Sequence, residues 1–399
     1  MSFAFPVEIA CEGSAQVLVP RLEAFVETPS DYAPSKAPVF YNPVMEKNRD
    51  FAVLALQVFQ NSVGRRLRAC EPLTGCGIRG IRLAKEVRDV QQVVINDINN
   101  EAFQLAQFNV EKNLLKRIVC AENEDANLLL SRFGAPRKRF DYIDIDPFGS
   151  PMPYVDSALR ALRSGGLIAL TATDLAPLCG VHPKACIRKY GGKPLRTEYC
   201  HELAVRLLAG ALARSAARYD NSIMMLFSYG SQHYIRLYAT IHHGARKANS
   251  SLMNMGYIKH CFSCFHREAS PGIFKVTVEN CPECKGAMDF AGPLWIDKIV
   301  DEDFVALLEK EARMRDLRHM RNIRRQLSLT KQEAKAPFAY YVVDKICDKI
   351  GLPIPSKGDI IAELEKGGYI ANSTYYSHHG IKTDASAKTV AKTIRELSK

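Results

Sequence analysis

The sequence predicts an α/β protein built on a mostly parallel, Rossmann-like sheet. Three observations lead to this prediction: apolar strand-like runs alternate with helix-like segments between residues 67 and 173, the turns between them are short, and a glycine-rich loop follows the first run. Two long apolar and aromatic runs, 222–229 and 232–242, come next, with a turn containing Gly230 between them. They predict an antiparallel hairpin that closes the sheet.

The elements of the sheet are expected in a definite order. Residues 1 to about 66 are proline-rich and predicted to be irregular, apart from a helix at 49–60. The sequence Ser164-Gly165-Gly166 is expected to form the turn before the last parallel strand. The parallel strands are predicted at 67–72, 92–95, 117–120, 140–145 and 167–173, with helices from the glycine loop to about 87 and at 100–113.

Length and composition define the broad class. A chain of 399 residues with 47% hydrophobic and 24% charged residues is typical of a soluble globular protein with two or more domains. No apolar run is long enough to cross a membrane, and Met1–Ala10 lacks a secretory pattern. Such a chain is expected to be cytoplasmic, so its 12 cysteines are predicted to be packed thiols or metal ligands rather than disulfides.

Two domains are expected, at 1–243 and 244–399. The net charge of +11 and the Lys and Arg residues concentrated between 311 and 335 suit either a helix face that meets phosphates or an ordinary solvated face. The second domain is predicted to contain a zinc ribbon at 258–290 and a winged-helix-like end at 336–399, with helices at 344–350 and 360–366 and a strand at 369–376.

The glycine-rich loop indicates a nucleotide-like cofactor. Gly75-x-Gly77-x-x-Gly80 follows the first strand and opens a helix, as in folds that bind dinucleotides. Asp97 ends the next strand, where a carboxylate can hold a ribose diol. The loop therefore predicts a cofactor that contains adenosine, and by itself it leaves NAD and S-adenosylmethionine open.

Two further acids favour the methyl donor. Glu71 ends the first strand, where a carboxylate suits the ammonium of S-adenosylmethionine and would repel a pyrophosphate. Asp125 follows the third strand, where it can accept a hydrogen bond from an adenine amine. One acid in such a place is usually a helix cap or a surface charge. Three acids at three successive strand ends favour S-adenosylmethionine.

The sequence Asp146-Pro147-Phe148-Gly149 ends the fourth strand, at the edge where the cofactor is expected. The lone pair of an aromatic amine is delocalised, so its methylation needs an acceptor that holds the N–H groups and leaves the nitrogen facing the methyl group. Asp146 can accept these bonds, Pro147 stiffens the turn, and Phe148 can stack on an unpaired base. These three residues are therefore predicted to be catalytic, in a site that methylates a base amine.

Four cysteines have the spacing of metal ligands. Cys261-x-x-Cys264 and Cys281-x-x-Cys284 are two pairs separated by a short segment, which is typical of a zinc ribbon. Four protein ligands leave no open coordination position, so the predicted Zn²⁺ is structural rather than catalytic.

These motifs resemble those of the tRNA guanine-26 N2-dimethyltransferase family. The chain departs from the family's usual loop, because Thr74-Gly75-Cys76-Gly77 replaces a Ser-Ala-[Ser/Thr]-Gly-like run. The resemblance covers most of residues 39–298, in the blocks Val39-Phe40-Tyr41-Asn42-Pro43, Asn48-Arg49-Asp50, Gly77-Ile78-Arg79-Gly80, Asp146-Pro147-Phe148-Gly149-Ser150-Pro151, Thr171-Ala172-Thr173-Asp174, Pro194-Leu195-Arg196-Thr197-Glu198 and Gly292-Pro293-Leu294-Trp295.

The resemblance implies a class I methyltransferase that transfers two methyl groups from S-adenosylmethionine to N2 of a tRNA guanine. It implies tRNA as the partner. The lack of a long apolar run predicts no membrane contact, and no obligate protein partner is evident from the sequence. By position, Asp146 is expected to hold the guanine amine, with Phe40 and Phe148 as the two sides of a base-stacking slot. The expected cofactor contacts are Arg49, Arg79, Asp97, Asp125 and Ala126, together with Glu71, Gly75 and Gly77 from the strand-end argument.

Three alternatives remain open from the sequence. The chain could methylate a base amine of ribosomal RNA or DNA, or it could be a nicotinamide oxidoreductase that uses the same glycine loop. A non-enzymatic zinc-ribbon RNA-binding protein is the alternative from a different class.

Overall fold

The computed structural model describes residues 3–26, 34–231, 233–274, 277 and 279–398. Residues 1 and 2 of the N-terminus and Gln232, the predicted start of the second hairpin strand, lie outside the described residues. The predicted domain boundary after residue 243 stays a prediction. By its internal contacts the chain divides into unit 1, Met1–Pro147, Pro153–Leu170 and Leu307–Arg324, and unit 2, Phe148–Met152, Thr171–Ala306 and Arg325–Lys399.

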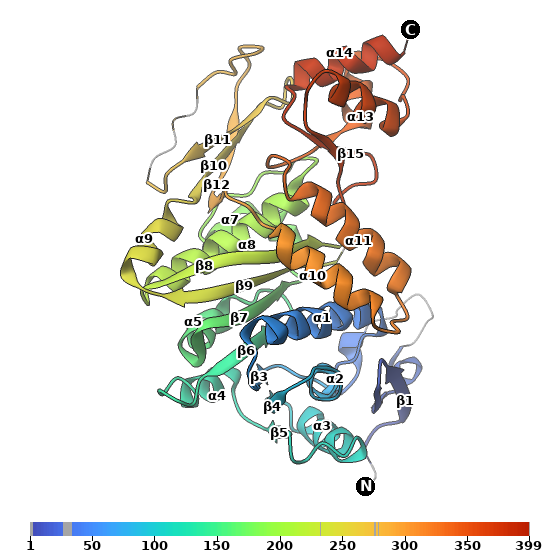
Figure 1. Cartoon of the computed structure of the whole chain (residues 1–399), viewed down its shortest axis with the longest axis vertical. Helices are drawn as coiled ribbons and strands as arrows, with labels where there is room; N and C mark the ends of the chain where they lie inside the picture. Colours follow the sequence, from blue (N-terminus) through green and yellow to red (C-terminus); the bar gives the residue numbers. More distant parts are fainter. Residues whose placement is uncertain (1–2, 27–33, 232, 275–276, 278, 399) are drawn as a thin grey trace. The chain divides into compact units, whose positions relative to one another are not determined.

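One seven-stranded sheet has the order β5-β4-β3-β6-β7-β9-β8 (Figure 1). The neighbouring pairs from β5 to β7 are parallel, whereas β8 and β9 form an antiparallel hairpin. The predicted mostly parallel α/β sheet with a closing hairpin is confirmed. The strands are β3 (Leu67–Glu71), β4 (Val90–Asn96), β5 (Val119–Glu122), β6 (Phe140–Ile145), β7 (Leu162–Ala172), β8 (Asn221–Gly230) and β9 (Ile235–His243).

The connections of unit 1 reverse direction in the middle of the sheet. From β3 the chain proceeds outward to β4 and β5, and then returns to add β6 and β7 on the other side of β3. Right-handed crossovers in opposite directions leave helices on both faces, with α1, α2 and α3 on one side and α4 and α5 on the other (Figure 1). The point of reversal, between β3 and β6, is where sheets of this kind bind ligands. The helices are α1 (Glu46–Val63), α2 (Ile78–Glu86), α3 (Asn100–Lys112), α4 (Ala126–Arg132) and α5 (Met152–Ala161).

The N-terminal segment is not irregular as predicted, because β1 (Val7–Glu12) and β2 (Ala15–Pro20) pair as an antiparallel hairpin. Val17 and Val19 of β2 are buried, and β2 packs on α3. The Asn109 side chain of α3 accepts from the Leu18 N–H at 2.7 Å and donates to its carbonyl at 2.9 Å. The sequence could not reveal this hairpin because its partner lies far along the chain.

The predicted bounds of several other elements were wrong. The predicted Ser164-Gly165-Gly166 turn lies inside β7, where the register with β6 jumps and Gly165 has a φ of 78°. These residues therefore form an irregularity of the strand rather than its start. The strand predicted at 369–376 is shorter, Ala371–Ser373, and the cationic stretch at 311–335 is divided between two helices, α10 (Glu302–Arg313) and α11 (Met320–Glu333).

Unit 2 has its own layers around the buried helix α8 (Cys200–Ala217), which contacts β8, β9 and β12. Two three-stranded sheets have the orders β11-β10-β12 and β13-β15-β14. Among the described residues, no helix is both long and apolar enough to cross a membrane. The remaining elements are α6 (Leu175–Leu178), α7 (Pro183–Tyr190), α9 (Ala245–Leu252), β10 (Met255–His260), β11 (Arg267–Pro271), β12 (Asp289–Trp295), β13 (Tyr341–Val342), α12 (Val343–Ile350), α13 (Lys357–Lys366), β14 (Ala371–Ser373), β15 (Gly380–Thr383) and α14 (Ala387–Leu397).

A buried ion network around Lys382 ties the last part of unit 2 to α8. The Lys382 Nζ lies 3.0 Å from Glu202 and 3.3 Å from Glu333. Glu202 also pairs with Arg206 at 2.9 Å and accepts from the Ala339 N–H at 2.9 Å. Burial raises the pKa of Glu202, but Lys382 and Arg206 outweigh it and lower that pKa to about 2. The network depends on one lysine that faces two acids.

Replacing this lysine tests the network. We expect Lys382→Met to reduce the free energy of unfolding by about 3–5 kcal/mol at neutral pH, because Glu202 and Glu333 would be left buried without their shared cation. Urea unfolding measures the change. Lys388→Met, on an exposed part of α14, is the control and should change stability by less than about 0.5 kcal/mol. Equal stability of the two variants would contradict the role of Lys382.

Candidate active site

The glycine loop follows β3 and turns sharply into α2. Gly75 has a φ of 56°, and a Cβ atom there would lie 2.7 Å from the Phe40 carbonyl oxygen. Gly80 has no room either, because a Cβ would lie 2.2 Å from the Ile95 side chain. These contacts need glycine, and they bring the backbone of Phe40 against the loop, as the prediction of a shared site for Phe40 and the loop requires.

Asp97 follows β4 and fastens the loop from the side. Its carboxylate accepts from the backbone N–H of Gly75 at 2.9 Å and from that of Asn99 at 3.0 Å. Burial raises the pKa of Asp97, and these two hydrogen bonds partly offset the effect. The Asn99 side chain donates to the Pro38 carbonyl at 2.7 Å, so the end of β4 also holds the segment that leads to Phe40.

Arg79 is the centre of a buried cluster of charges. Its guanidinium pairs with Glu71 at 3.2 Å, with Asp144 at 3.4 Å and with Asp146, while NH1 donates to the Asn48 Oδ1 at 2.8 Å. Only 4% of the Arg79 side chain is exposed, and Asp146 is also largely enclosed. Arg79 thus brings together Glu71 and Asp146, and all three are predicted site residues.

Glu71 braces the loop from inside. One oxygen accepts from the Gly80 N–H at 2.9 Å and from the Thr74 hydroxyl at 2.6 Å, and the other faces Arg79. Burial raises the pKa of Glu71 to about 7, against the opposing effect of Arg79 and these hydrogen bonds. The N–H group of Gly80, in the first turn of α2, therefore already donates its hydrogen bond to the Glu71 carboxyl group.

Arg49 is held by a partner that the sequence did not suggest. Its guanidinium forms two hydrogen bonds with Glu12 of β1, at 2.7 and 2.5 Å, and one with the Asn42 carbonyl at 3.0 Å. Both charged groups are buried. Although burial lowers the pKa of Arg49, Glu12 raises it above its ordinary value. Its predicted contact with a cofactor stays a prediction.

Asp125 and Ala126 stand at the start of α4. One oxygen of Asp125 accepts from the N–H groups of Asn127 and Leu128, at 2.8 and 3.1 Å, so this acid is a helix cap. Ala126 is buried as the first residue of the helix. Capping by one oxygen leaves the second oxygen of Asp125 for another donor.

Four acids stand at or just after the carboxyl ends of adjacent parallel strands. In the spatial order β5-β4-β3-β6 they are Asp125, Asp97, Glu71 and Asp146. At about 4.8 Å between strands, this series of acids extends over ~14 Å. It therefore has the dimensions of an extended small molecule lying across the switch point.

The turn after Asp146 passes from unit 1 into unit 2. Pro147 ends unit 1, and the side chain of Phe148 is 66% exposed. Gly149 has a φ of 78°, and its N–H and carbonyl bond to the Thr173 hydroxyl at 2.7 Å and the Thr173 N–H at 2.9 Å. Thr173 therefore holds the turn directly after Phe148.

The four predicted metal ligands lie together in unit 2. The Sγ atoms of Cys261, Cys264, Cys281 and Cys284 are all within 4.8 Å of one another, and two of the pairs are 3.5 Å apart. Four sulfurs around a tetrahedral zinc at ~2.3 Å would be about 3.8 Å apart. The donor set therefore fits a zinc ion.

The two cysteine pairs are folded alike. The N–H of Cys261 donates to the His266 carbonyl and that of Cys281 to the Gly286 carbonyl, each at 2.8 Å. After the second cysteine of each pair, Phe265 and Lys285 adopt φ values of 62° and 61°. The same strained turn, used twice, aims all four sulfurs at one point.

Comparisons with known proteins agree with this geometry. A family model described as N2,N2-dimethylguanosine tRNA methyltransferase matches residues 13–395. The chain belongs to this family.

Similar members of the N2,N2-dimethylguanosine tRNA methyltransferase family span nearly the whole chain. The tRNA (guanine(26)-N(2))-dimethyltransferase of Methanobrevibacter smithii is 41% identical over 92% of this chain and 94% of its own length. The tRNA (guanine(26)-N(2)/guanine(27)-N(2))-dimethyltransferase of Aquifex aeolicus is 35% identical over 98% and 96%. The structure of Trm1 from Pyrococcus horikoshii with S-adenosyl-L-methionine matches with a TM-score of 0.85 and 34% identity, over 97% of this chain and 99% of that one.

Two polar residues of this family member's site escaped the sequence reasoning. Asn48, next to Arg49, is fully buried, and its Nδ2 has no hydrogen-bond partner within the described residues. Asp144 lies inside β6, where the Tyr142 hydroxyl donates to it at 2.5 Å and Arg79 pairs with it. The alternation of acids in β6 was the available signal for Asp144. Asn48 stands in the family block Asn48-Arg49-Asp50, but no role was predicted for it.

The raised pKa of Glu71 makes a testable prediction about stability in this family member. Because the folded-state pKa of about 7 lies above the ordinary value of 4.5, the folded state holds a proton that the unfolded state has lost. The free energy of unfolding should therefore fall as the pH rises from about 4.5 to 7. We expect Glu71→Gln to remove this part of the slope in denaturant unfolding measured across that range. The exposed control Glu8→Gln should retain it, and an unchanged slope in Glu71→Gln would contradict the assignment.

Proposed function

We propose that this chain transfers methyl groups from S-adenosylmethionine to N2 of guanine 26 in tRNA, forming N2,N2-dimethylguanine. The observation that carries the proposal is the order of the strand-end acids, Asp125, Asp97, Glu71 and Asp146. In this spatial order, the four acids would face the adenine amine, the ribose diol and the ammonium-bearing end of the cofactor, and then the amine of the target base. The names of the similar family members specify the base and the RNA.

The residues present fit the proposed cofactor. Asp97 would accept from the ribose hydroxyls and the second oxygen of Asp125 from the adenine amine, with Ala126 beside it. Gly75 and Gly77 would let the cofactor approach the backbone. At the amino-acid end, the Nδ2 of Asn48, which has no hydrogen-bond partner among the described residues, lies beside the Arg79 cluster, where a carboxylate could accept from it. Glu71, Arg49 and Arg79 would set the charge around that end.

The bonding of the loop argues against a nicotinamide oxidoreductase. A dinucleotide would need the N–H groups at the start of α2 for its pyrophosphate. In this chain the Gly80 N–H donates to the Glu71 carboxyl group, so it is not available to a phosphate. The acidic side chain at this place suits the ammonium of S-adenosylmethionine better than a pyrophosphate.

The chain's own residues would catalyse mainly by positioning. The bound donor supplies an electrophilic methyl group on a sulfonium. Arg79 pairs with one oxygen of Asp146, Oδ2, which orients the carboxylate and leaves Oδ1 to accept an N–H of the guanine amine. The nitrogen lone pair would then face the methyl group, and Asp146 could take the proton released after transfer. Phe148 and Phe40 would hold the base by stacking.

Separating binding from transfer tests this assignment. Asp146→Ala should reduce methyl transfer to unmodified tRNA at least about 100-fold, while changing S-adenosylhomocysteine affinity less than about threefold. Asp97→Ala should weaken that affinity about 10- to 100-fold, because it loses charge-assisted hydrogen bonds to the ribose. Calorimetry and nucleoside analysis at positions 26 and 27 provide the measurements.

The exposed substitution Asp348→Ala on α12 serves as the control for both variants. Wild-type protein that binds S-adenosylhomocysteine but yields no N2-methylguanine in tRNA would overturn the proposed function. Transfer to ribosomal RNA or DNA in preference to tRNA would replace the substrate.

We also propose that Cys261, Cys264, Cys281 and Cys284 hold one structural Zn²⁺, which makes the β10–β12 region a zinc ribbon. Support comes from four sulfurs at near-tetrahedral separations and from the repeated turn that presents them. The metal would crosslink the two turns, since Cys261 and Cys281 are the only buried side chains among the described residues of 261–288.

Zinc loss should therefore be visible in stability. We expect about one zinc per chain by elemental analysis of the purified protein, and a lower melting temperature after a strong chelator removes it. Cys281→Ser should lose the metal and the stability together, whereas Cys120→Ser, at an exposed cysteine of β5, should lose neither. Metal-free wild-type protein that melts at the same temperature with and without added zinc would refute the site.

A further inference from the structure

Basic residues precede every parallel strand of unit 1, at the opposite edge of the sheet from the acids. Parallel strands all begin at one edge, so residues at their starts form a row. We call this set the amino-edge row. Its members are Arg65 and Arg66 before β3, Arg88 before β4, Lys116 and Arg117 before β5, Arg137, Lys138 and Arg139 before β6, and Arg163 at the start of β7.

The acid at the centre of the row is buried rather than exposed. Asp141 of β6 is fully enclosed, and Arg65 and Arg163 share it at 2.6 and 3.2 Å. It also accepts from the Arg68 N–H at 2.8 Å. One carboxylate that faces two guanidinium groups leaves an excess of positive charge. Burial and the neighbouring Arg163 accordingly lower the pKa of Arg68.

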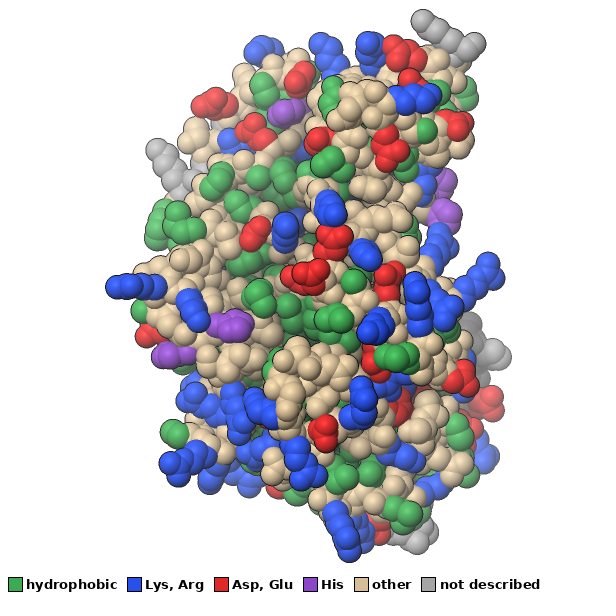
Figure 2. Space-filling model, in the orientation of Figure 1, with side chains coloured by type: hydrophobic (Ala, Val, Ile, Leu, Met, Phe, Trp, Pro, Cys, Tyr) green, Lys and Arg blue, Asp and Glu red, His purple; other side chains and the backbone are tan. Residues whose placement is uncertain are grey.

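Much of the row is unneutralised at the surface. Arg66, Arg117, Arg137 and Lys138 are exposed, and none forms an ion pair with an acid in the described part of the chain. Figure 2 shows Lys and Arg side chains gathered at the lower left of the view, where Figure 1 draws α4. The row is therefore a cationic surface rather than a set of internal salt bridges.

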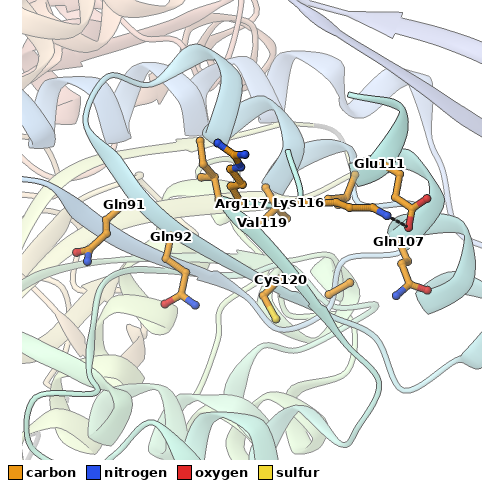
Figure 3. A pocket seen from close by; sticks show the side chains of 11 residues that line it. Gln91, Gln92, Gln107, Glu111, Lys116, Arg117, Val119 and Cys120 are labelled. Atoms are coloured by element: carbon orange, nitrogen blue, oxygen red, sulfur yellow. Dashed lines mark ion pairs between the residues drawn. The ribbon is translucent and has the colours of Figure 1, made fainter. Parts of the chain in front are cut away.

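One end of the row borders a polar hollow beside β5. Gln91 and Gln92 of β4, Gln107 and Glu111 of α3, and the Lys116–Ala121 segment line it. Figure 3 shows Lys116 directed to Glu111, which it meets at 2.7 Å, while the Arg117 guanidinium extends separately. Amide and guanidinium groups around an edge strand suit hydroxyl and phosphate oxygens better than an apolar ligand.

We propose that the amino-edge row binds the sugar-phosphate backbone of RNA, as a second contact for the tRNA that presents its guanine to Asp146. The inference rests on the proposed function for the identity of that RNA. Five strands at about 4.8 Å spread the row over ~19 Å, and a nucleic-acid duplex carries about one charge per 1.7 Å. Seven of the nine members are arginines, whose fork matches phosphate oxygens.

The distance from the reacting end is one strand length. Arg139 and Asp146 flank the six residues of β6, so at 3.3 Å for each step along the strand they are about 23 Å apart. One strand of a helical nucleic acid covers this distance in about seven nucleotides at ~3.4 Å each. A folded RNA can thus reach both edges of the sheet, with its target base at one and its backbone at the other.

The test removes charge from the row without uncovering Asp141. The variant is the triple Arg66→Gln, Arg137→Gln, Lys138→Gln, and its control is Arg21→Gln, Lys85→Gln, Lys112→Gln, which removes equal charge elsewhere on unit 1. Filter binding of unmodified tRNA over a salt series measures affinity. We expect the row variant to bind about tenfold or more weakly and to lose about two to three units of the slope of log K against log salt.

Activity separates this inference from the proposed function. The row variant should raise the KM for tRNA while kcat and S-adenosylhomocysteine affinity stay within about twofold of wild type. Unchanged tRNA affinity in an active row variant would refute the row and point to another partner, such as an acidic protein. An equal loss of tRNA affinity in the control variant would show that only the net charge matters, and this would also refute the row. If wild-type protein binds tRNA but makes no N2-methylguanine, the proposed function fails. The salt series then still shows whether the amino-edge row binds RNA.

Discussion

The buried guanidinium of Arg79 is the constraint on which the candidate site depends. Glu71, Asp144 and Asp146 come from the ends or interior of two neighbouring strands, and without a cation between them they could not be buried together. The shared cation joins the glycine loop, the centre of β6 and the Asp146 carboxylate into one unit. A change at any of the three acids therefore alters the charge that the other two experience.

The sharing of one buried charge by two or more opposite charges occurs elsewhere in the chain. Lys382 serves two acids in unit 2, and Asp141 serves two arginines at the amino edge. Each buried charge stands between segments that are distant in sequence, so these pairs specify which segments meet as well as contributing to stability. Apolar residues alone would pack the same layers with less definite partners.

Local patterns in the sequence predicted the sheet and the acids at its strand ends, because hydrophobic periodicity and turn residues can be recognised within a short segment. Contacts between segments that are distant along the chain could not be predicted in this way. Glu12 binds Arg49 across 37 positions, and Asn109 holds the β1–β2 hairpin from α3. Asn48 belongs to a family block, but its buried contact with Arg79 depends on the fold. The basic residues before each strand were readable, but only the order β5-β4-β3-β6-β7 turns them into one row.

The opposite placement of charge at the two ends of the parallel strands gives unit 1 an electrical polarity. Acids stand where the strands end and cations where they begin, so the field along the strands has a fixed direction. A polyanion that approaches unit 1 would be attracted to one end and repelled from the other. The acidic end would then favour a group without phosphates, such as a base rotated out of its helix. Selection of the reacting group would then begin before any contact with it.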